Sequence, residues 1–293
     1  MEKILVMTDS NSGITQKEKE KEKYGIEIVP MPFMINDQEY FEDISLSQED
    51  FYKHLEDNTK INTSQPSLGC LEEMWTNHLK NYDYILYIPM SSGLSASCAS
   101  SKMLAQDFNG RVRVIDNHRI SISQKESVLE ALQMVKEGKN IDEIEKYLTD
   151  SAFHSIIFLL VEKLKYLKQG GRVTPAVALI GDILKIRPLL VTTGDKFDTY
   201  AKCRSEKQAL GKIFEAFDEY INGEYKDYYE KGQLVFSIAY SKNKGYSDIL
   251  KEQVLNRFPK LVFHFCDPLS LSVSCHTGPN SIGCCLAVNE HLN

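Results

Sequence analysis

The chain has 293 residues, of which 42% are hydrophobic and 26% charged, and its net charge is −7. This length suits one large or two medium domains, and the composition is that of an ordinary globular protein. The acidic balance argues against a nucleic-acid partner, because neutralising phosphates requires a basic face. The apolar runs are too short to span a bilayer and the first residues too short for a secretory signal, so we expect a cytoplasmic location.

The seven cysteines indicate reduced thiols rather than a disulfide framework or a metal site. Their number is odd and no C-x-x-C pair occurs. Cys275-His276 and Cys284-Cys285 lack the spacing of zinc ligands. We therefore expect no metal and no other cofactor.

Strand-like and helical stretches alternate through the first half of the chain, which predicts a mostly parallel, doubly wound sheet with helices on its faces. Residues 26–35 and 38–41 are expected to form a hairpin about Asn36-Asp37. The predicted strands are 3–8, 84–90 and 111–116, and the predicted helices are 16–23, 47–58, 68–80, 95–108, 121–137 and 141–150.

The apolar run at 156–161 restarts this pattern and predicts a boundary between an N-terminal α/β domain, 1–153, and a C-terminal α/β domain, 154–293. A hairpin signature about Thr192-Thr-Gly-Asp195 makes the second sheet mixed. The predicted helices are 164–169, 175–184, 206–221 and 245–257, and the predicted strands are 188–191, 196–201, 234–240, 261–266 and 284–288.

Three polar stretches follow predicted strands or open predicted helices. Ser91, Ser92 and Ser95 follow the strand at 84–90, where the free N–H groups of a helix N-terminus attract anionic oxygens. The same serines could instead cap the helix. Thr63 and Ser64 precede another helix, and Asp9-Ser10 ends the first strand.

No nucleotide-binding fingerprint and no kinase motif set is present, so the chain is not expected to carry out ATP chemistry alone. The stretch 93–97, Gly-Leu-Ser-Ala-Ser, differs by one residue from the G-x-S-x-G nucleophile elbow. Ser95 with the later His276 would then form a serine hydrolase, with an acid drawn from Asp182, Asp195 or Asp267. This is the alternative function.

Five motifs occur together and in order: Thr8-Asp-Ser10, Thr63-Ser-Gln-Pro-Ser67, Ser91-Ser-Gly-Leu-Ser95, Leu167-Lys-Gln-Gly-Gly-Arg172 and His276-Thr-Gly-Pro-Asn-Ser-Ile-Gly283. Each alone is weak, but the set spans almost the whole chain. It resembles the DegV family, the fatty-acid-binding subunits of bacterial fatty acid kinases.

The resemblance implies two α/β domains with a long-chain fatty acid buried between them. It implies that Thr63, Ser95, His276 and, after the hairpin, Arg204 hold the carboxylate. A separate ATP-binding kinase subunit would then convert the acid to an acyl phosphate, and the carrier itself would have no catalytic residue. Lipid exchange would bring transient membrane contact, and Asp9 and Ser10 would lie near the transferred phosphate or merely end a strand. The complete predicted ligand-binding set is Thr63, Ser64, Ser92, Gly93, Ser95, Arg204, His276 and Thr277.

The chain departs from the family pattern at two positions. Ala96 replaces the usual glycine, which should alter fit more than function, and Gln169 replaces a common lysine, which affects recognition of the kinase. Hydroxyl, imidazole and guanidinium groups are suitable donors to a carboxylate. The tail needs an apolar tunnel, for which residues 31–34, 156–161 and 175–184 are candidates.

Overall fold

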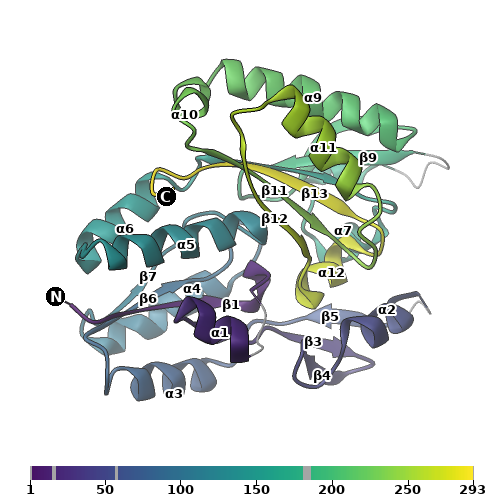
Figure 1. The fold of residues 1–293 in the computed structure, drawn as a ribbon. Helices are drawn as coiled ribbons and strands as arrows, with labels where there is room; N and C mark the ends of the chain where they lie inside the picture. The colour runs from purple at the N-terminus through teal and green to yellow at the C-terminus, as the bar shows by residue number, and fades with distance from the viewer. Residues whose placement is uncertain (1, 15–17, 57–58, 181–185, 293) are drawn as a thin grey trace.

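The computed structural model describes residues 2–14, 18–56, 59–180 and 186–292. Two sheets with their helices lie one above the other, and a small third sheet lies beside the lower layer (Figure 1). All strands of the four-stranded sheet precede those of the six-stranded sheet in the sequence. The prediction of two α/β layers, one parallel and one mixed, is confirmed, whereas the exact domain boundary after residue 153 stays a prediction.

The four-stranded sheet is parallel throughout and has the order β2-β1-β6-β7. β1 is buried along its whole length, because both faces of the sheet are covered. Its Ile4 and Val6 face one core, and Leu5 and Met7 face the other. The strands are β1 (Ile4–Asp9), β2 (Glu27–Val29), β6 (Tyr84–Ile88) and β7 (Val112–Val114).

Helices cover both faces of this sheet, as the alternation in the sequence predicted. Leu71 and Trp75 of α3 pack with Cys98 of α4 on one face. α5 and α6 cover the other face, where Val128 and Ile144 are fully buried. Asn140 and Glu143 form a capping box that begins α6. The helices are α1 (Glu18–Tyr24), α3 (Leu68–His78), α4 (Ser97–Ala105), α5 (Ile122–Lys136) and α6 (Ile141–Asp150).

The three-stranded sheet contains the predicted hairpin. Asn36 and Asp37 have φ values of 50° and 65°, which fits the tight turn between β3 and β4. β5 (Ile61–Thr63), which the sequence did not predict, pairs with β3 and brings Thr63 opposite Phe33. The remaining elements are β3 (Pro32–Ile35), β4 (Gln38–Phe41) and α2 (Gln48–Glu56).

The six-stranded sheet has the order β10-β9-β8-β13-β11-β12 and is antiparallel except between β11 and β12. Alternate residues of β8 face two different cores. Ile156, Phe158 and Leu160 pack under α9 and α11, whereas Ile157 and Leu159 point toward the first half of the chain. The elements are β8 (Ser155–Leu160), β9 (Arg187–Thr192), β10 (Asp198–Cys203), β11 (Leu234–Tyr240), β12 (Val262–Pro268), β13 (Ile282–Val288), α9 (Glu206–Asn222) and α11 (Ser247–Arg257).

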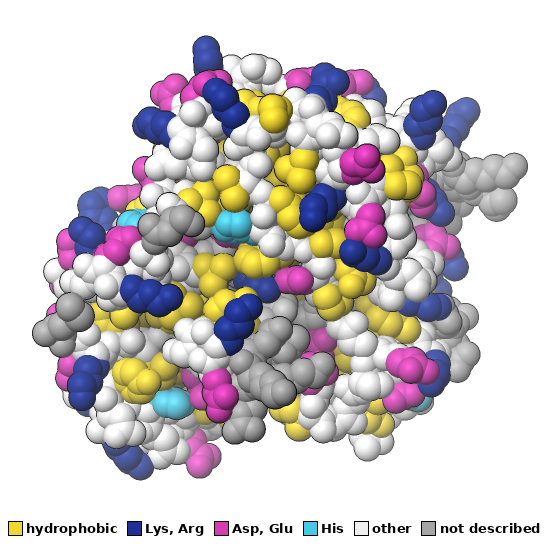
Figure 2. All heavy atoms as spheres, viewed as in Figure 1, with side chains coloured by type: hydrophobic (Ala, Val, Ile, Leu, Met, Phe, Trp, Pro, Cys, Tyr) yellow, Lys and Arg dark blue, Asp and Glu magenta, His cyan; other side chains and the backbone are white. Residues whose placement is uncertain are grey.

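α5 also joins the two layers through an ion pair and a hydrogen bond. Lys125 Nζ lies 2.7 Å from Asp267 Oδ2, and Glu126 lies 2.9 Å from His264 Nδ1. Glu126 is completely buried, so its partners across the seam replace water. On the face in Figure 2, hydrophobic side chains gather between the two layers, while charges of both signs are dispersed elsewhere.

The shorter helices show where local prediction was incomplete. The helix predicted over 175–184 appears only as α8 (Pro175–Ala178), and residues 181–185 lie outside the described residues. The sequence did not predict α10 (Lys226–Glu230) or α12 (Leu271–Thr277), whereas α7 (Lys165–Gly170) matches its prediction closely. The 3₁₀ turns are η1 (Ser10–Ser12) and η2 (Gln106–Phe108).

Candidate functional site

A cavity of about 340 Å³ lies between the two layers. This volume is within the range of small-molecule sites. Both halves of the chain contribute to its wall, so neither forms it alone. The lining residues are Asn11, Met31, Thr63, Ser64, Gln65, Met90, Leu94, Ser95, Ala96, Ser100, Ile120, Ser121, Ile122, Ile157, Leu159, Leu167, Arg172, Phe197, Ala239, Leu269, Ser272, Val273, His276, Thr277 and Gly283.

One wall of the cavity is the inner face of the six-stranded sheet. Ile157 and Leu159 of β8 reach it because side chains alternate along a strand. Gly283 of the neighbouring β13 lies opposite Leu159 and leaves space beside it, since it has no side chain. Ile122, the first residue of α5, and Ile120 just before the helix belong to the same apolar cluster. This wall is suited to a hydrocarbon chain.

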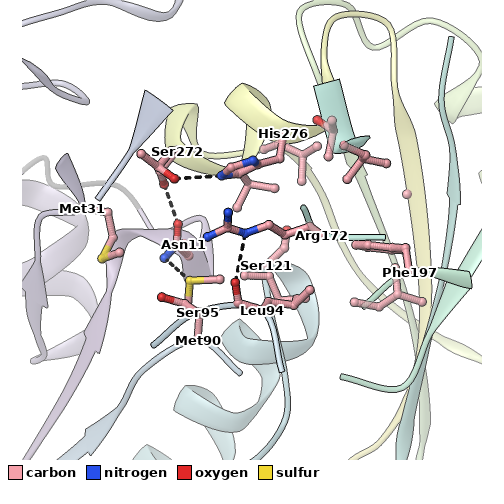
Figure 3. A pocket seen from close by; sticks show the side chains of 18 of the residues that line it. Asn11, Met31, Met90, Leu94, Ser95, Ser121, Arg172, Phe197, Ser272 and His276 are labelled. Atoms are coloured by element: carbon pink, nitrogen blue, oxygen red, sulfur yellow. Dashed lines mark hydrogen bonds between the residues drawn. The ribbon is translucent and has the colours of Figure 1, made fainter. Parts of the chain in front are cut away.

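Polar side chains gather at another part of the wall. Thr63 Oγ1 and His276 Nε2 are hydrogen-bonded at 2.8 Å, which joins β5 to α12. The guanidinium of Arg172 lies between His276 and Leu94, and its Nε donates to the Leu94 carbonyl at 3.1 Å (Figure 3). Ser95 lines the cavity beside them. A hydroxyl pair, an imidazole and a guanidinium therefore converge from four separate elements.

The charges at this polar end are favourable for an anion. Burial, with a smaller contribution from Arg172, lowers the pKa of His276 to about 4, so the ring is neutral near pH 7. Burial also lowers the pKa of Arg172, which still remains a cation. Among the residues that the structure describes, no carboxylate forms a salt bridge with Arg172. A partly buried cation without an anionic partner attracts an anionic ligand.

α12 brings His276 and Thr277 to the cavity. Ser270 caps its start by accepting from the Val273 amide, and Gly278 at its end has a φ of 76°. α12 packs against α7, where Gly170 directly faces the imidazole. A Cβ at position 170 would stand 2.8 Å from His276 Cε1 and still closer to Nδ1. The glycine of this motif is thus required by a close contact.

The serine turn after β6 divides into two parts. Ser95 reaches the cavity, and its Oγ accepts from the Ser97 amide at 3.1 Å, so it also supports the start of α4. Ser92 is exposed, and its amide donates to Asp116 Oδ1 at 3.2 Å. Gly93 lies against Asp195 of the second half, too close for any side chain. The structure therefore does not bring Ser92 or Gly93 to the cavity.

Arg204 is also outside the cavity. It follows β10 at the surface, where its backbone amide donates to Gln208 Oε1 at 2.8 Å at the start of α9. The cation that lines the cavity is instead Arg172. Arg172 is the last residue of one of the five sequence motifs, Leu167-Lys-Gln-Gly-Gly-Arg172, so the sequence did contain a signal for this arginine. Thr63, Ser64, Ser95, His276 and Thr277 do line the cavity together.

The hydrogen bonds of Asp9 and Ser10 indicate a structural role. Asp9 is buried and accepts from the amides of Met90 and Asn11 at 2.8 and 3.0 Å and from Gln124 Nε2 at 3.1 Å. Burial outweighs these bonds and raises its pKa to about 6. Ser10 Oγ accepts from the Met31 amide. These groups hold β1 to the adjoining loops, and neither lines the cavity.

The arrangement does not support the serine hydrolase. His276 Nε2 is bonded to Thr63 rather than Ser95, and Nδ1 faces Gly170 rather than a carboxylate. Of the candidate acids, Asp267 pairs with Lys125 and Asp195 packs against Gly93, while Asp182 lies outside the described residues. A triad needs base and nucleophile within hydrogen-bond reach and an acid that orients the base.

Within the described ranges no group of three or more His, Cys, Asp or Glu side chains could hold a metal ion, and all seven cysteines are free. Burial raises the pKa of the Cys275 thiol well above its usual value, which keeps it protonated. No described helix has the length and apolar character needed to cross a membrane.

The fold and the cavity define a two-layer α/β protein with an amphipathic internal site. Residues 3–289 match the model of the uncharacterised DegV family, and the chain belongs to that family. A DegV domain-containing protein from Deinococcus radiodurans is 30% identical over 220 residues, which are 75% of this chain and 78% of that protein. One from Staphylococcus aureus is 26% identical over 97% of this chain and 98% of its own length.

Solved structures show the same fold. DegV from Bacillus subtilis, described as a fatty acid binding protein, has a TM-score of 0.83 and 25% identity over 98% of this chain and all of that one. A fatty-acid-binding DegV family protein from Thermus thermophilus has a TM-score of 0.87 and 24% identity over 98% and 99% of the two chains.

Proposed function

We propose that this protein binds a long-chain fatty acid in the cavity between the two layers. The tail would lie along Ile157 and Leu159, and the carboxylate would be held by Thr63, Ser95 and Arg172 together with His276. The observation that carries the proposal is the guanidinium of Arg172, which has no carboxylate partner among the described residues, at one part of a largely apolar cavity. The Bacillus subtilis relative, described as binding fatty acid, supports it.

The energetics fit a tightly held lipid. Burying one methylene is worth roughly 0.8 kcal/mol, so ~14 methylenes give about 11 kcal/mol before the costs of association. The neutral hydroxyls of Thr63 and Ser95 and the neutral ring of His276 complete the coordination of the head group without adding a second buried charge. Such a site binds its ligand without transforming it, which fits a carrier rather than an enzyme.

We further propose that the protein presents the carboxylate, in the cytoplasm, to a separate ATP-dependent kinase subunit that forms the acyl phosphate. Loading and unloading would involve transient contact with a membrane. The family resemblance supports this role, as does the absence of a nucleotide-binding motif from the sequence.

Solvent extraction of the purified protein followed by mass spectrometry tests the binding proposal. We expect one equivalent of fatty acid, reduced in Ser95→Ala and Arg172→Gln. Ser92→Ala is the matched control, because Ser92 belongs to the same turn but lies outside the cavity. Lipid-free, well-folded wild-type protein would contradict the proposal.

The presentation role has a separate test. The loaded protein, ATP and the fatty acid kinase ATP-binding subunit of the same cell are incubated with hydroxylamine, which traps acyl phosphate as a hydroxamate. Hydroxamate should require all three components. If the loaded protein yields no hydroxamate, the proposed kinase role is wrong, while the proposed lipid binding still stands.

A further inference from the structure

The wall of the cavity between the two layers contains a buried asparagine, Asn11, which no sequence motif includes. Asn11 is the middle residue of η1, the 3₁₀ turn that follows β1, and it is 2% exposed. A buried asparagine side chain has a carbonyl oxygen and an amide nitrogen, and both need hydrogen-bond partners. The partners of these two atoms therefore show which of them is available to a ligand.

Hydrogen bonds within η1 hold Asn11 in place without a ligand. The Asn11 amide N–H of the backbone donates to Asp9 Oδ1 at 3.0 Å, and Ser12 Oγ donates to the Asp9 carbonyl at 2.9 Å. Ser10 Oγ accepts from the Met31 amide at 3.0 Å, which ties the turn to the residue before β3. A residue whose backbone is already ordered loses little entropy when its side chain binds a ligand.

Two hydroxyl groups of α12 and its cap determine the orientation of the Asn11 side chain. Ser272 Oγ donates its proton to Asn11 Oδ1. Because a hydroxyl has one proton, the 3.2 Å hydrogen bond between Ser270 and Ser272 then has Ser270 as its donor. The carbonyl oxygen of Asn11 is thus bound by α12, and the amide nitrogen faces the other way.

The amide nitrogen of Asn11 has a weak acceptor. Within the described part of the chain, Nδ2 donates to Met90 Sδ at 2.9 Å, and a thioether sulfur is a poor acceptor. In Figure 3 the guanidinium of Arg172 points toward Asn11, so an anion bound to the guanidinium would lie beside this amide. A carboxylate oxygen is a much stronger acceptor than the sulfur, because its hydrogen bonds are charge-assisted.

We propose that the side-chain amide of Asn11 donates to the carboxylate of the fatty acid, with Ser272 as the positioning residue that keeps the nitrogen toward the cavity; this rests on the proposed function. A freely turning asparagine could accept from a hydroxyl as well as donate to a carboxylate. Held by Ser272, Asn11 offers only a donor. It therefore favours a head group that only accepts, such as a carboxylate, over an alcohol, whose own proton needs an acceptor.

Asn11→Asp tests this proposal with almost no change in shape. Delipidated protein is titrated, at mildly alkaline pH, with the fatty acid recovered from the wild type and with the primary alcohol of the same chain length. Aspartate still accepts from Ser272, but it repels a carboxylate and accepts from an alcohol. We expect affinity for the acid to fall about tenfold or more and affinity for the alcohol to be retained. Asn117→Asp is the matched control and should leave the ratio of the two affinities unchanged, because Asn117 is also buried but lies outside the cavity.

Two further variants complete the test. Asn11→Leu, which removes the donor without adding a charge, should also lower the acid-to-alcohol affinity ratio, and it replaces Asn11→Asp if that variant does not fold. Ser272→Ala should lower the ratio about threefold in the wild type and have no effect in Asn11→Leu, where no amide remains to be oriented.

The outcomes separate this proposal from the proposed function. If the Asn11 variants have the same acid-to-alcohol ratio as the wild type, or weaken both ligands equally, the role of Asn11 at the carboxylate is wrong, while fatty acid binding still stands. If the wild type binds neither ligand, the proposed function itself is contradicted. If Ser272→Ala lowers the ratio equally with and without Asn11, Ser272 does not act through Asn11 and its positioning role is wrong.

Discussion

Gly170→Ala gives a sharp test of how the polar end of the cavity is built. Gly170 is the last residue of α7, and an added Cβ would stand 2.8 Å from His276 Cε1 and closer still to Nδ1. The imidazole must then turn away from position 170. Its hydrogen bond with Thr63 Oγ1 at 2.8 Å is then lost.

The expected change in stability is opposite in sign to that of a glycine-to-alanine substitution elsewhere in a helix. Replacing glycine by alanine in a helix stabilises the fold by about 0.5–1 kcal/mol. Losing the Thr63–His276 bond and leaving its partners unsatisfied costs about 1–3 kcal/mol. We therefore expect Gly170→Ala to destabilise the protein by about 1–2 kcal/mol and to release bound fatty acid.

Urea denaturation of the variant, with quantification of retained lipid, is the assay. Gly211→Ala is the matched control, because Gly211 lies in α9 and a Cβ added there would have no neighbouring atom within 4 Å. It should stabilise the protein by about 0.5–1 kcal/mol and leave the lipid in place. A Gly170→Ala protein as stable as Gly211→Ala, with full lipid content, would refute the reasoning.

The fatty acid profile should depend on position 283, where a Cβ meets only ordinary contacts at 3.7 Å or more. Gly283→Leu should shift the extracted fatty acids to shorter chains, and affinity for the longest acids should fall about tenfold for every two methylenes that are excluded. Gly283→Ala, the control, should leave the profile unchanged. Equal profiles for the leucine variant and the wild type would contradict the assignment of this wall. Because the pKa of His276 is lowered to about 4 in the folded protein, the unfolded chain binds the proton first as the pH falls. The free energy of unfolding should therefore decrease by up to about 3 kcal/mol between pH 6.5 and pH 4. This loss is measured as the difference in unfolding free energy between the wild type and His276→Gln at each pH. The comparison is needed because Asp9 and Glu130, with pKa values raised to about 6 and 7, change stability in the opposite direction. A difference that does not depend on pH would refute the prediction. A fluorophosphonate probe should not label Ser95, as checked by proteomic analysis with denatured protein as the control. Covalent labelling of Ser95 would support the serine hydrolase instead.

Much of the fold could be predicted because its determinants are local. The Asn36-Asp37 turn has the positive φ values that those residue types tolerate, and the apolar run at 156–161 became β8. α12 was not predicted because Leu271–Thr277 is rich in serine, threonine and valine, which have low helix propensity. Its packing against α7 decides the conformation, and such contacts are not visible in sequence.

The site was predictable to the extent that motifs specify residues. Thr63, Ser95 and His276 meet at one cavity although they are far apart in sequence. The sequence does not show which arginine reaches the cavity, because position in the chain after a hairpin does not determine the direction of a side chain. Arg204 lies at the surface at the start of α9, whereas Arg172, just after Gly171, lines the cavity.

The polar contacts along α5 make the two layers dependent on each other. Glu126 is completely buried against His264, and Lys125 pairs with Asp267. If the layers were expressed as separate polypeptides, the first would carry the Glu126 carboxylate without the hydrogen-bond partners that His264 and Ser237 supply in the intact chain. Neither polypeptide should then accumulate as a stable fold, and the intact chain should melt in a single cooperative transition.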